Sequence, residues 1–379
     1  MAIGTSNENV EPQALAIESL LASSLGRSVS VTGSDRLAPW ALTRVHLSAG
    51  GRPHPSVIVK WLRNHPAGFR TDPSQILTEA AALRFLAEIG FEHAPGLVAC
   101  DFEAGVLVLE DLTPAMPLAE LLIAVVPEAE AGLRSFAATL GELHGATVGR
   151  EAQYYRLRST YGPVDPVAER LRFLGADWRR TPSDLEALGV RLRGEVEAEL
   201  HVVSDLFAEP GPFLAFSNGD AGANNFMFGG AGGRLVDFEF AGFRLAFADA
   251  VCLYVPGPMW MTVSDPRRTG VEAEYRCALS SAVPEAEDDA SFGLGVAAAA
   301  LAFAVMRLAR LAALDARPAG DDSRAQMVTT LERASDVAEA HAVLPHLRGW
   351  ARRAAEVLRK RWPDTDIAFD TTSYLLRGN

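Results

Sequence analysis

Two neighbouring stretches decide the fold of this chain: SNGDAGANN at residues 217–225 and LVDFE at residues 235–239. In the first stretch Asp220 is followed by Asn225 after four intervening residues, and in the second Asp237 stands beside apolar neighbours. A glycine-rich gap of hairpin length separates the two stretches. The spacing predicts oxygen-bearing side chains on two adjacent loops: one carboxylate that can accept a proton, and two ligands suited to a divalent cation such as Mg²⁺.

Length and composition bound the class of protein. With 379 residues, 49% of them hydrophobic, the chain can bury one large core or two ordinary ones, so a two-lobed protein is expected. The formal net charge of −13 argues against a nucleic-acid partner, because nucleic-acid binders need a basic face. The acidic balance is compatible with a cationic ligand.

Neither a disulfide scaffold nor a membrane protein is expected. Cys100, Cys252 and Cys277 are an odd number without Cys-x-x-Cys spacing, which predicts free thiols. Residues 1–12 lack the basic and apolar regions of a signal peptide. The longest apolar run, residues 292–306, contains two glycines and is too short to span a bilayer, so it predicts a buried helix. We therefore expect a soluble, cytoplasmic protein without a membrane partner.

The first 112 residues combine short β-branched runs with two helical patterns. Strands are predicted at residues 30–32, 43–47, 56–61, 97–100 and 106–110, and helices at residues 11–25 and 75–89. After the first helix the order is β-β-β-α-β-β. This order predicts a small antiparallel sheet with one helix packed on it.

Beyond residue 112 the pattern is mainly helical. Candidate helices cover residues 116–125, 127–147, 184–207, 291–315, 323–342 and 345–362. Only residues 213–240 interrupt this run, with β-like and glycine-rich sequence. The chain is therefore predicted to be of the α+β class, with an N-lobe at residues 1–112 and a C-lobe at residues 113–379.

A lysine and a glutamate in the first part can form an ion pair. Lys60 lies near the end of a predicted strand, where its ammonium can reach nucleotide phosphates, and Glu79 lies on the helix that follows. A strand lysine alone is more often a solvated edge charge, and Asn225 or Asp237 alone is more often a turn or cap residue. Their joint occurrence, in this order around Asp220, favours a functional site.

With these residues in place, the chain resembles the aminoglycoside phosphotransferase and choline kinase superfamily of small-molecule kinases. The family's catalytic loop is His-x-Asp-x-x-x-x-Asn and its metal motif is Asp-Phe/Trp-Glu; residues 218–225 and 237–239 match both, except that Asn218 replaces the histidine. The resemblance implies a bilobal protein-kinase-like fold, with an antiparallel sheet plus helix in the N-lobe and a mainly helical C-lobe. It also implies ATP or another NTP as donor, Mg²⁺, and a small-molecule hydroxyl as acceptor.

The resemblance implies roles for individual residues. Asp220 corresponds to the catalytic base, and Asn225 and Asp237 correspond to the Mg²⁺ ligands. The nucleotide-contacting positions are an ion pair and an inter-lobe hinge, at Lys60, Glu79, Glu110, Asp111 and Leu112. Further matches are Leu143-His144-Gly145, and Gly242 with Asp249.

Two departures from the family pattern keep an alternative open. Asn218 stands where a histidine normally braces the catalytic loop, although an asparagine can also donate and accept hydrogen bonds. The expected phosphate-covering loop, residues 35–42, has no glycine, and Pro39 lacks an N–H. The alternative is a pseudokinase or nucleotide-binding regulatory module without transfer activity. A protein Ser/Thr kinase is disfavoured, because no Ala-Pro-Glu segment follows Asp237.

The acceptor itself cannot be named from the sequence. We expect it to contact the helices between residues 152 and 207 and the chain after Pro256, because these segments wall the cleft that the catalytic base faces. Residues 255–261 are apolar and kinked, which suits either a pocket floor or core packing. The acidic composition favours a cationic or neutral polyol acceptor over an anionic one.

Overall fold

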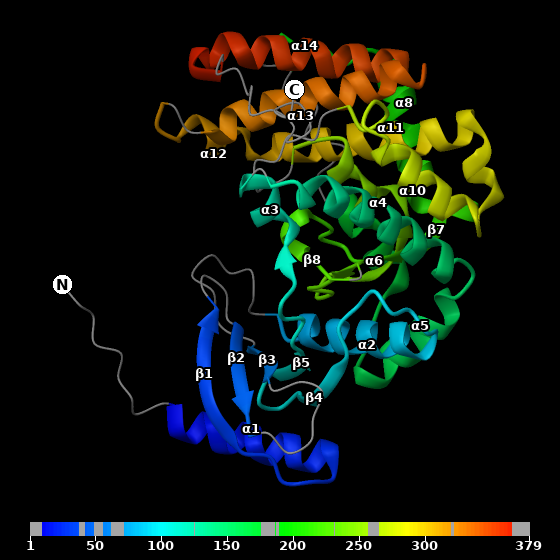
Figure 1. Cartoon of the computed structure of the whole chain (residues 1–379). Coiled ribbons are helices and arrows are strands. Elements are labelled where there is room, and N and C mark those ends of the chain that lie inside the picture. The colour runs from blue at the N-terminus through cyan, green and yellow to red at the C-terminus, as the bar shows by residue number, and fades with distance from the viewer. Residues whose placement is uncertain are drawn as a thin grey trace.

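A computed structural model gives the arrangement of most of the chain (Figure 1). It describes residues 10–37, 42–48, 56–61, 72–124, 126–175, 186, 189–230, 232–256, 265–319 and 322–365. Half of the predicted phosphate-covering loop (residues 38–41 of 35–42) and most of the apolar segment at 255–261 lie outside the described residues.

The N-terminal part is a five-stranded antiparallel sheet with a helix on each face. Its strands, in the order β1-β2-β3-β5-β4, are β1 (Val31–Leu37), β2 (Leu42–Leu47), β3 (Ser56–Trp61), β5 (Val106–Glu110) and β4 (Leu97–Asp101). The helices are α1 (Val10–Leu25) and α2 (Ser74–Glu88). The predicted β-β-β-α-β-β order is confirmed.

Strand alternation decides which way Lys60 points. On β3, Val57 and Val59 pack into a small apolar core that α1 closes, whereas Ile58 packs against the larger core on the other side. Because successive side chains of a strand point to opposite faces, Lys60 shares the face of Ile58. Helix α2 lies on that face and carries Glu79.

Two short sheets bring the two sequence motifs together. One pairs β7 (Leu214–Ser217) with β10 (Gly242–Leu245), and the other has the order β6-β8-β9, with β6 (Met116–Pro117), β8 (Phe226–Gly229) and β9 (Gly232–Leu235). Strand β10 runs antiparallel to β7 with Gly242 opposite Ser217, so the chain returns to the place where the first motif begins. The loop after β7 and the turn after β9 therefore lie side by side.

Most of the other described residues lie in helices. These helices are α3 (Leu118–Ala124), α4 (Glu128–Thr147), α5 (Glu151–Arg158), α6 (Pro166–Leu171), α8 (Gly194–Ala208), α9 (Phe247–Ala250), α10 (Val271–Ser280), α11 (Asp289–Arg307), α12 (Leu311–Asp315), α13 (Asp322–Ala340) and α14 (Pro345–Arg361). Helices α11, α13 and α14 pack together at the end of the molecule opposite the five-stranded sheet (Figure 1). The α+β class is confirmed, and the lobe boundary at residue 112 stays a prediction.

The prediction of one continuous helix over residues 184–207 was wrong; of its first part, residues 184, 185, 187 and 188 lie outside the described residues. Helix α8 begins at Gly194, and residues 189–193 ahead of it are not helical. Gly189 adopts a left-handed φ of 84°, which interrupts a helix, and Val190 is buried in the large core. The apolar pattern there reflects core packing of an irregular segment.

Other boundaries also differ from the sequence pattern. Met116 and Pro117 pair with β8 as a strand, so the helix predicted from Met116 begins at Leu118. Helices α5, α6 and α10 were not among the predicted helices. For α6 the signal was present, because Asp165 caps its first turn by accepting from the N–H of Val167 at 2.9 Å.

Helix α11 is the predicted buried helix. Among the described residues, Asp289–Asp315 is the one stretch apolar and long enough to cross a membrane, and 72% of its most apolar window is buried inside the protein. Burial of that extent is typical of a core helix. The predicted buried helix at residues 292–306 is confirmed, but the expectation that this run is too short to span a bilayer was wrong, because the apolar stretch extends over Asp289–Asp315.

Helices α4 and α10 approach so closely that Gly141 cannot gain a side chain. A Cβ at this position would lie 2.4 Å from the Tyr275 carbonyl oxygen and 3.0 Å from the Leu279 backbone nitrogen. We predict that Gly141→Ala lowers the free energy of unfolding by about 1–3 kcal/mol, because backbone atoms cannot yield as side chains do. The control is Gly194→Ala, where no atom lies within 4 Å. Urea unfolding measures both; equal stability of the two variants contradicts the close packing.

Candidate active site

Lys60 lies among three carboxylates that come from distant parts of the chain. Its Nζ donates to Glu79 Oε2 at 2.6 Å, forms an ion pair with Glu239 Oε2 at 2.9 Å, and makes a short hydrogen bond to Asp237 Oδ1. Lys60 is 6% exposed and Glu79 is 1% exposed. Because a buried charge is costly unless it is paired, these contacts fix the ammonium in place.

The electrostatics of this cluster leave an excess of negative charge. Burial by itself would lower the pKa of the Lys60 ammonium, but the charges of Asp237, Glu79 and Glu239 outweigh it and raise the pKa. Burial, together with the charges of Asp237 and Glu239, raises the pKa of Glu79 against the opposing effect of Lys60. One ammonium shared among three carboxylates does not neutralise them, so the cluster attracts a further cation.

The donor set fits a divalent cation next to Asp237. The carboxylate oxygens of Glu79, Asp237 and Glu239 lie within 4.8 Å of one another, but Lys60 contacts all three, so this triad is a lysine site rather than a metal site. Asp237 has the most exposed side chain of the three, at 22%. Its carboxylate, with the amide oxygen of Asn225 on the neighbouring loop, supplies the oxygen ligands that Mg²⁺ prefers.

Asp220 lies in the loop after β7 and has a strongly altered acidity. Asn225 Nδ2 donates to its backbone oxygen at 2.9 Å and to its Oδ2 at 3.3 Å. Burial, followed by the charges of Asp237, Glu239 and Asp249, raises the pKa of the Asp220 carboxyl to about 7. The residue also keeps an exposed surface, and contact with water reduces such a shift. The pKa of this carboxyl therefore lies above its ordinary value.

Asn218 ties the two loops together. The residue is fully buried, and its Nδ2 donates to the backbone oxygens of Val236 at 3.1 Å and Asp237 at 3.3 Å. Its Oδ1 accepts from the Asp220 N–H at 3.2 Å. The asparagine thus makes the bracing hydrogen bonds for which a histidine was expected.

Asp249 holds the same loop from beneath. Its buried carboxylate accepts from Asn218 N at 2.6 Å, Gly219 N at 3.2 Å and Ser217 Oγ at 2.5 Å, and it lies 3.7 Å from His144 Nε2. Burial would raise the pKa of Asp249, but the contacts with His144 and Ser217 hold it below its ordinary value. An ionised acceptor therefore fixes the backbone just ahead of Asp220.

The backbone at Asp237 is strained. Its φ of 65° lies in the left-handed region, which costs a non-glycine residue about 1–2 kcal/mol. Such strain persists only where the surroundings enforce it. Here Phe238 is fully buried, and the Asp237 carboxylate is bound by Lys60. The strained turn directs this carboxylate toward the lysine.

The side chain of Asp111 stabilises the predicted hinge. It accepts from Ser56 Oγ at 2.6 Å, Arg44 Nε at 2.7 Å and Thr113 Oγ1 at 2.8 Å. Burial would raise the pKa of Asp111, but these donors lower it. The carboxylate anchors the segment after β5 to strands β2 and β3.

The other two predicted hinge residues, Glu110 and Leu112, differ in their hydrogen bonds. Glu110 accepts from Arg234 Nη1 at 2.7 Å, an ion pair that joins β5 to β9. Leu112 accepts from Ala115 N at 2.9 Å, and its own backbone N–H has no partner within the described part of the chain. That N–H is a donor that a ligand can use.

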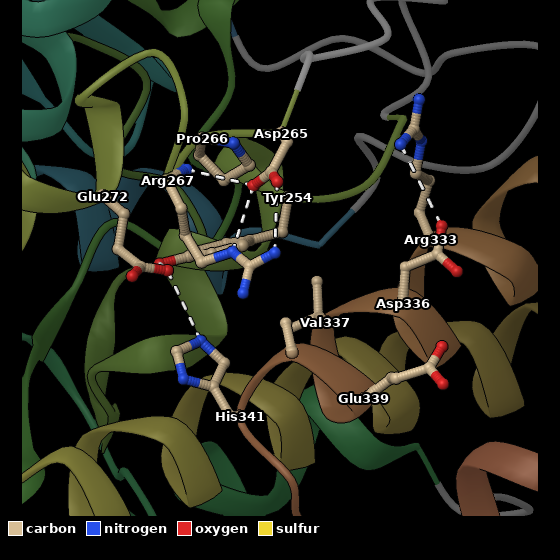
Figure 2. A pocket seen from close by; sticks show the side chains of 11 residues that line it. Tyr254, Asp265, Pro266, Arg267, Glu272, Arg333, Asp336, Val337, Glu339 and His341 are labelled. Atoms are coloured by element: carbon tan, nitrogen blue, oxygen red, sulfur yellow. Dashed lines mark hydrogen bonds and ion pairs between the residues drawn. The ribbon is translucent and has the colours of Figure 1, made fainter.

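A separate pocket opens between the start of α10, the segment at residues 265–267 and α13 (Figure 2). Its volume is about 330 Å³. Glu272 Oε2 accepts from Tyr254 Oη at 3.0 Å and lies 3.4 Å from His341 Nε2. No described residue donates to Glu272 Oε1, so this oxygen remains available on a largely buried carboxylate.

Sequence reasoning missed the roles of Glu239 and Asp249. Both positions were matched to the family pattern, but neither was given a contact. Glu239 is the third carboxylate on Lys60, and its signal was its position two residues after Asp237 in the same motif. The match of Asp249 to the family pattern was its signal, but the match did not show its partners, two of which are backbone N–H groups.

Replacing Asp249 tests the clamp. We predict that Asp249→Asn lowers the free energy of unfolding at pH 7 by about 1.5–3 kcal/mol, because charge-assisted hydrogen bonds are lost. Since the folded-state pKa of Asp249 is depressed, its stabilisation is present above the ordinary pKa and is lost as pH falls below about 3.9. The difference in the free energy of unfolding between wild type and variant should therefore become smaller at acid pH.

Urea unfolding at pH 7 and at low pH measures this difference. The matched control is Asp205→Asn, at an exposed position on α8. A stability of Asp249→Asn at pH 7 equal to that of the control contradicts the clamp.

Comparison with solved structures identifies the fold. An ethanolamine kinase of Plasmodium vivax matches with a TM-score of 0.50 at 9% identity, over 90% of this chain and 91% of that one. A choline/ethanolamine kinase family protein of Mesorhizobium loti has a TM-score of 0.45 at 19% identity, over 87% of this chain and 94% of that one. The choline kinase LicA of Streptococcus pneumoniae has a TM-score of 0.44 at 16% identity, over 87% of this chain and 99% of that one. At 9% identity the likeness to the ethanolamine kinase concerns the fold alone, and it agrees with the kinase-like architecture expected from the sequence.

Comparison of sequences identifies the family. A search of curated proteins finds no match. The family model described as the phosphotransferase enzyme family matches residues 40–288, about two thirds of the chain, and this range includes both motifs. The family resemblance and the expectation of an enzyme are thereby confirmed. The chain belongs to the phosphotransferase enzyme family.

Proposed function

We propose that this protein transfers the γ-phosphoryl group of ATP, or of another NTP, to a hydroxyl of a small molecule with the help of Mg²⁺. The observation that carries the proposal is the Lys60 ammonium, bound at once to Glu79 on α2 and to Asp237 in the second motif. That arrangement provides a fixed cation for phosphate oxygens and a carboxylate for a metal. Membership of the phosphotransferase family supports it.

Each residue has a distinct role in the proposed mechanism. Lys60, oriented by Glu79, binds the phosphates, and the backbone N–H of Leu112 donates to the base of the nucleotide. Asp237 and Asn225 would hold Mg²⁺, which when bound neutralises charge on the phosphoryl group.

The acceptor is activated at Asp220. Its carboxylate accepts the proton of the acceptor hydroxyl as the oxygen attacks the γ-phosphorus. The bond between this phosphorus and the β–γ bridging oxygen breaks, and the nucleoside diphosphate leaves with the electron pair of that bond. Asn218 and Asp249 hold the Asp220 loop in register with the Asp237 turn. Little covalent chemistry is required, so positioning and electrostatics supply most of the rate enhancement.

The alternative of a pseudokinase without transfer activity receives less support. One of its arguments was the missing histidine, but Asn218 makes the bracing hydrogen bonds in its place. The glycine-free loop stays as its remaining argument. The raised pKa of Asp220 favours catalysis, since a general base works best with a pKa near the working pH.

We propose that the pocket at Glu272 receives part of the acceptor. None of the proposed catalytic residues lines it, so it would hold a portion remote from the reacting hydroxyl. Its walls carry four carboxylates (Asp265, Glu272, Asp336 and Glu339) against two arginines and one histidine. The excess of carboxylates and the available oxygen of Glu272 favour a ligand with hydrogen-bond donors, cationic or polyhydroxylated.

A screen of ATP consumption tests the function. We expect at least one compound of a panel of amino alcohols, sugars and hydroxylated antibiotics to be phosphorylated, as detected by mass spectrometry. Asp220→Asn should reduce transfer at least about 10³-fold while leaving Mg·ATP affinity within about 3-fold, because the base does not hold the nucleotide. Phosphate on protein side chains instead, or near-normal turnover by Asp220→Asn, contradicts the proposal.

The pH dependence of transfer should report Asp220. Because the base must be ionised and its pKa is raised toward about 7, kcat should rise with pH across the range from about 4 to 7 and level off above it. Added positive charge from Mg²⁺ lowers the pKa of the base, so the rising part of the pH profile should move to lower pH. The rate of the wild type is measured against pH at two Mg²⁺ concentrations; a rate that is flat from pH 4.5 to 8 argues against this base.

A charge-neutral variant tests the pocket. Glu272→Gln should raise the KM for the acceptor about 10-fold or more with the KM for ATP unchanged, because it removes a partly buried anionic acceptor. Glu274→Gln, two residues further along α10 and paired with Arg134 instead, is the matched control. Equal acceptor KM values for the two variants would remove this pocket from the binding site.

A further inference from the structure

Arg244 is a buried guanidinium for which the proposed mechanism gives no role. It lies on β10 and is 2% exposed, and the one hydrogen bond recorded for it among the described residues runs from Nη2 to the Phe240 backbone oxygen at 2.7 Å. Burial lowers the pKa of Arg244, and the negative charges of Asp249 and Glu169 partly offset this effect. Burying such a group costs stability, so its one strong contact calls for an explanation.

The carbonyl that Arg244 holds lies at the junction of the two catalytic loops. Phe240 directly follows the Asp237-Phe238-Glu239 turn. A Cβ added to Gly219 would lie 2.1 Å from the Phe240 oxygen, so the Phe240 peptide rests directly on the backbone beside Asp220. Gly219 also has a φ of 87°, which excludes most side chains.

The surroundings of Arg244 keep the guanidinium in this position. Glu169 on α6 and Arg244 flank Gly242, where an added Cβ would lie 3.0 Å from Glu169 Oε2 and 3.3 Å from Arg244 Nη2. Tyr155 Oη lies 3.6 Å from the same point and accepts from the Phe243 N–H at 3.4 Å. The absence of a side chain at Gly242 is what lets the two charged groups approach the turn.

We infer that Arg244 is a positioning residue: by holding the Phe240 carbonyl against Gly219, it fixes the spacing between the Asp220 loop and the turn that carries Asp237 and Glu239. This inference rests on the proposed function for its effect on rate, but not for its effect on the loops. Asn218 ties the loops together by hydrogen bonds on one side of the junction. Arg244 supports the junction on the other side, where β10 lies. A shift of about 1 Å between a base and a metal ligand is enough to reduce a rate about 100-fold.

Arg244→Met, Arg244→Lys and Gly242→Ala test the inference. Met keeps bulk without a donor, Lys keeps one charged donor, and Ala adds a methyl group that pushes Arg244 and Glu169 apart. Gly194→Ala, in open space, is the matched control. The first measurement is amide hydrogen exchange at residues 217–225 and 237–242, relative to α14, which requires no substrate. The second is turnover of Mg·ATP, with water or the best acceptor of the screen.

Arg244→Met should speed exchange in both loops at least about 10-fold and lower kcat about 10- to 100-fold, with the KM for ATP within about 3-fold. Arg244→Lys should recover most of both effects, and Gly242→Ala should show them to a smaller extent. A folded Arg244→Met with wild-type exchange and kcat overturns the inference, as does a Lys variant no better than Met. If Arg244→Met does not fold, the Gly242→Ala variant takes its place in both measurements. Amide exchange and kcat in Gly242→Ala that equal those of Gly194→Ala then overturn the inference.

Failure of the proposed function is distinguishable from failure of this inference. If the wild type turns over no ATP with any acceptor, the function fails, and the exchange measurement alone decides the role of Arg244.

Discussion

The contact of one lysine with three carboxylates is the interaction on which the rest of this site depends. Lys60 reaches Glu79 because strand alternation points it toward α2, and it reaches Asp237 and Glu239 because β10 returns to β7. Segments almost 180 residues apart in the sequence are joined by one ammonium. The three carboxylates would repel one another without it, so the lysine also stabilises the packing of the sheet and α2 against the second motif.

The loops of the site are held by polar contacts on several sides, and this explains how a departure from the family pattern is accommodated. Asn218 spans from the Asp220 N–H to the backbone of the next motif, and Asp249 accepts from the backbone beneath. Such contacts depend on hydrogen-bonding capacity more than on one residue type, so an asparagine can serve where a histidine is usual. The strained backbone of Asp237 persists because these contacts surround it.

Much of the fold and part of the site could be predicted from the sequence, and the limits have physical causes. The N-terminal strands and α2 follow clear periodicity, and the motif spacing placed Asp220, Asn225 and Asp237 on adjacent loops. The start of α8 was misplaced because buried irregular segments carry the same apolar residues as helices. The contacts of Asp249 and Arg244 arise from tertiary packing against backbone groups, which leaves no periodic pattern.

A structure of the protein with Mg²⁺ and a non-hydrolysable ATP analogue tests the central claim most directly. The account predicts that Lys60 keeps its contact with Glu79 and turns to the phosphates, while Asp237 and Asn225 coordinate the metal. It also predicts that Asp220 stays beside the γ-phosphate without binding it. A complex in which Lys60 remains bound to Asp237 and Glu239, with the nucleotide elsewhere or the metal held by Glu79, would contradict the account.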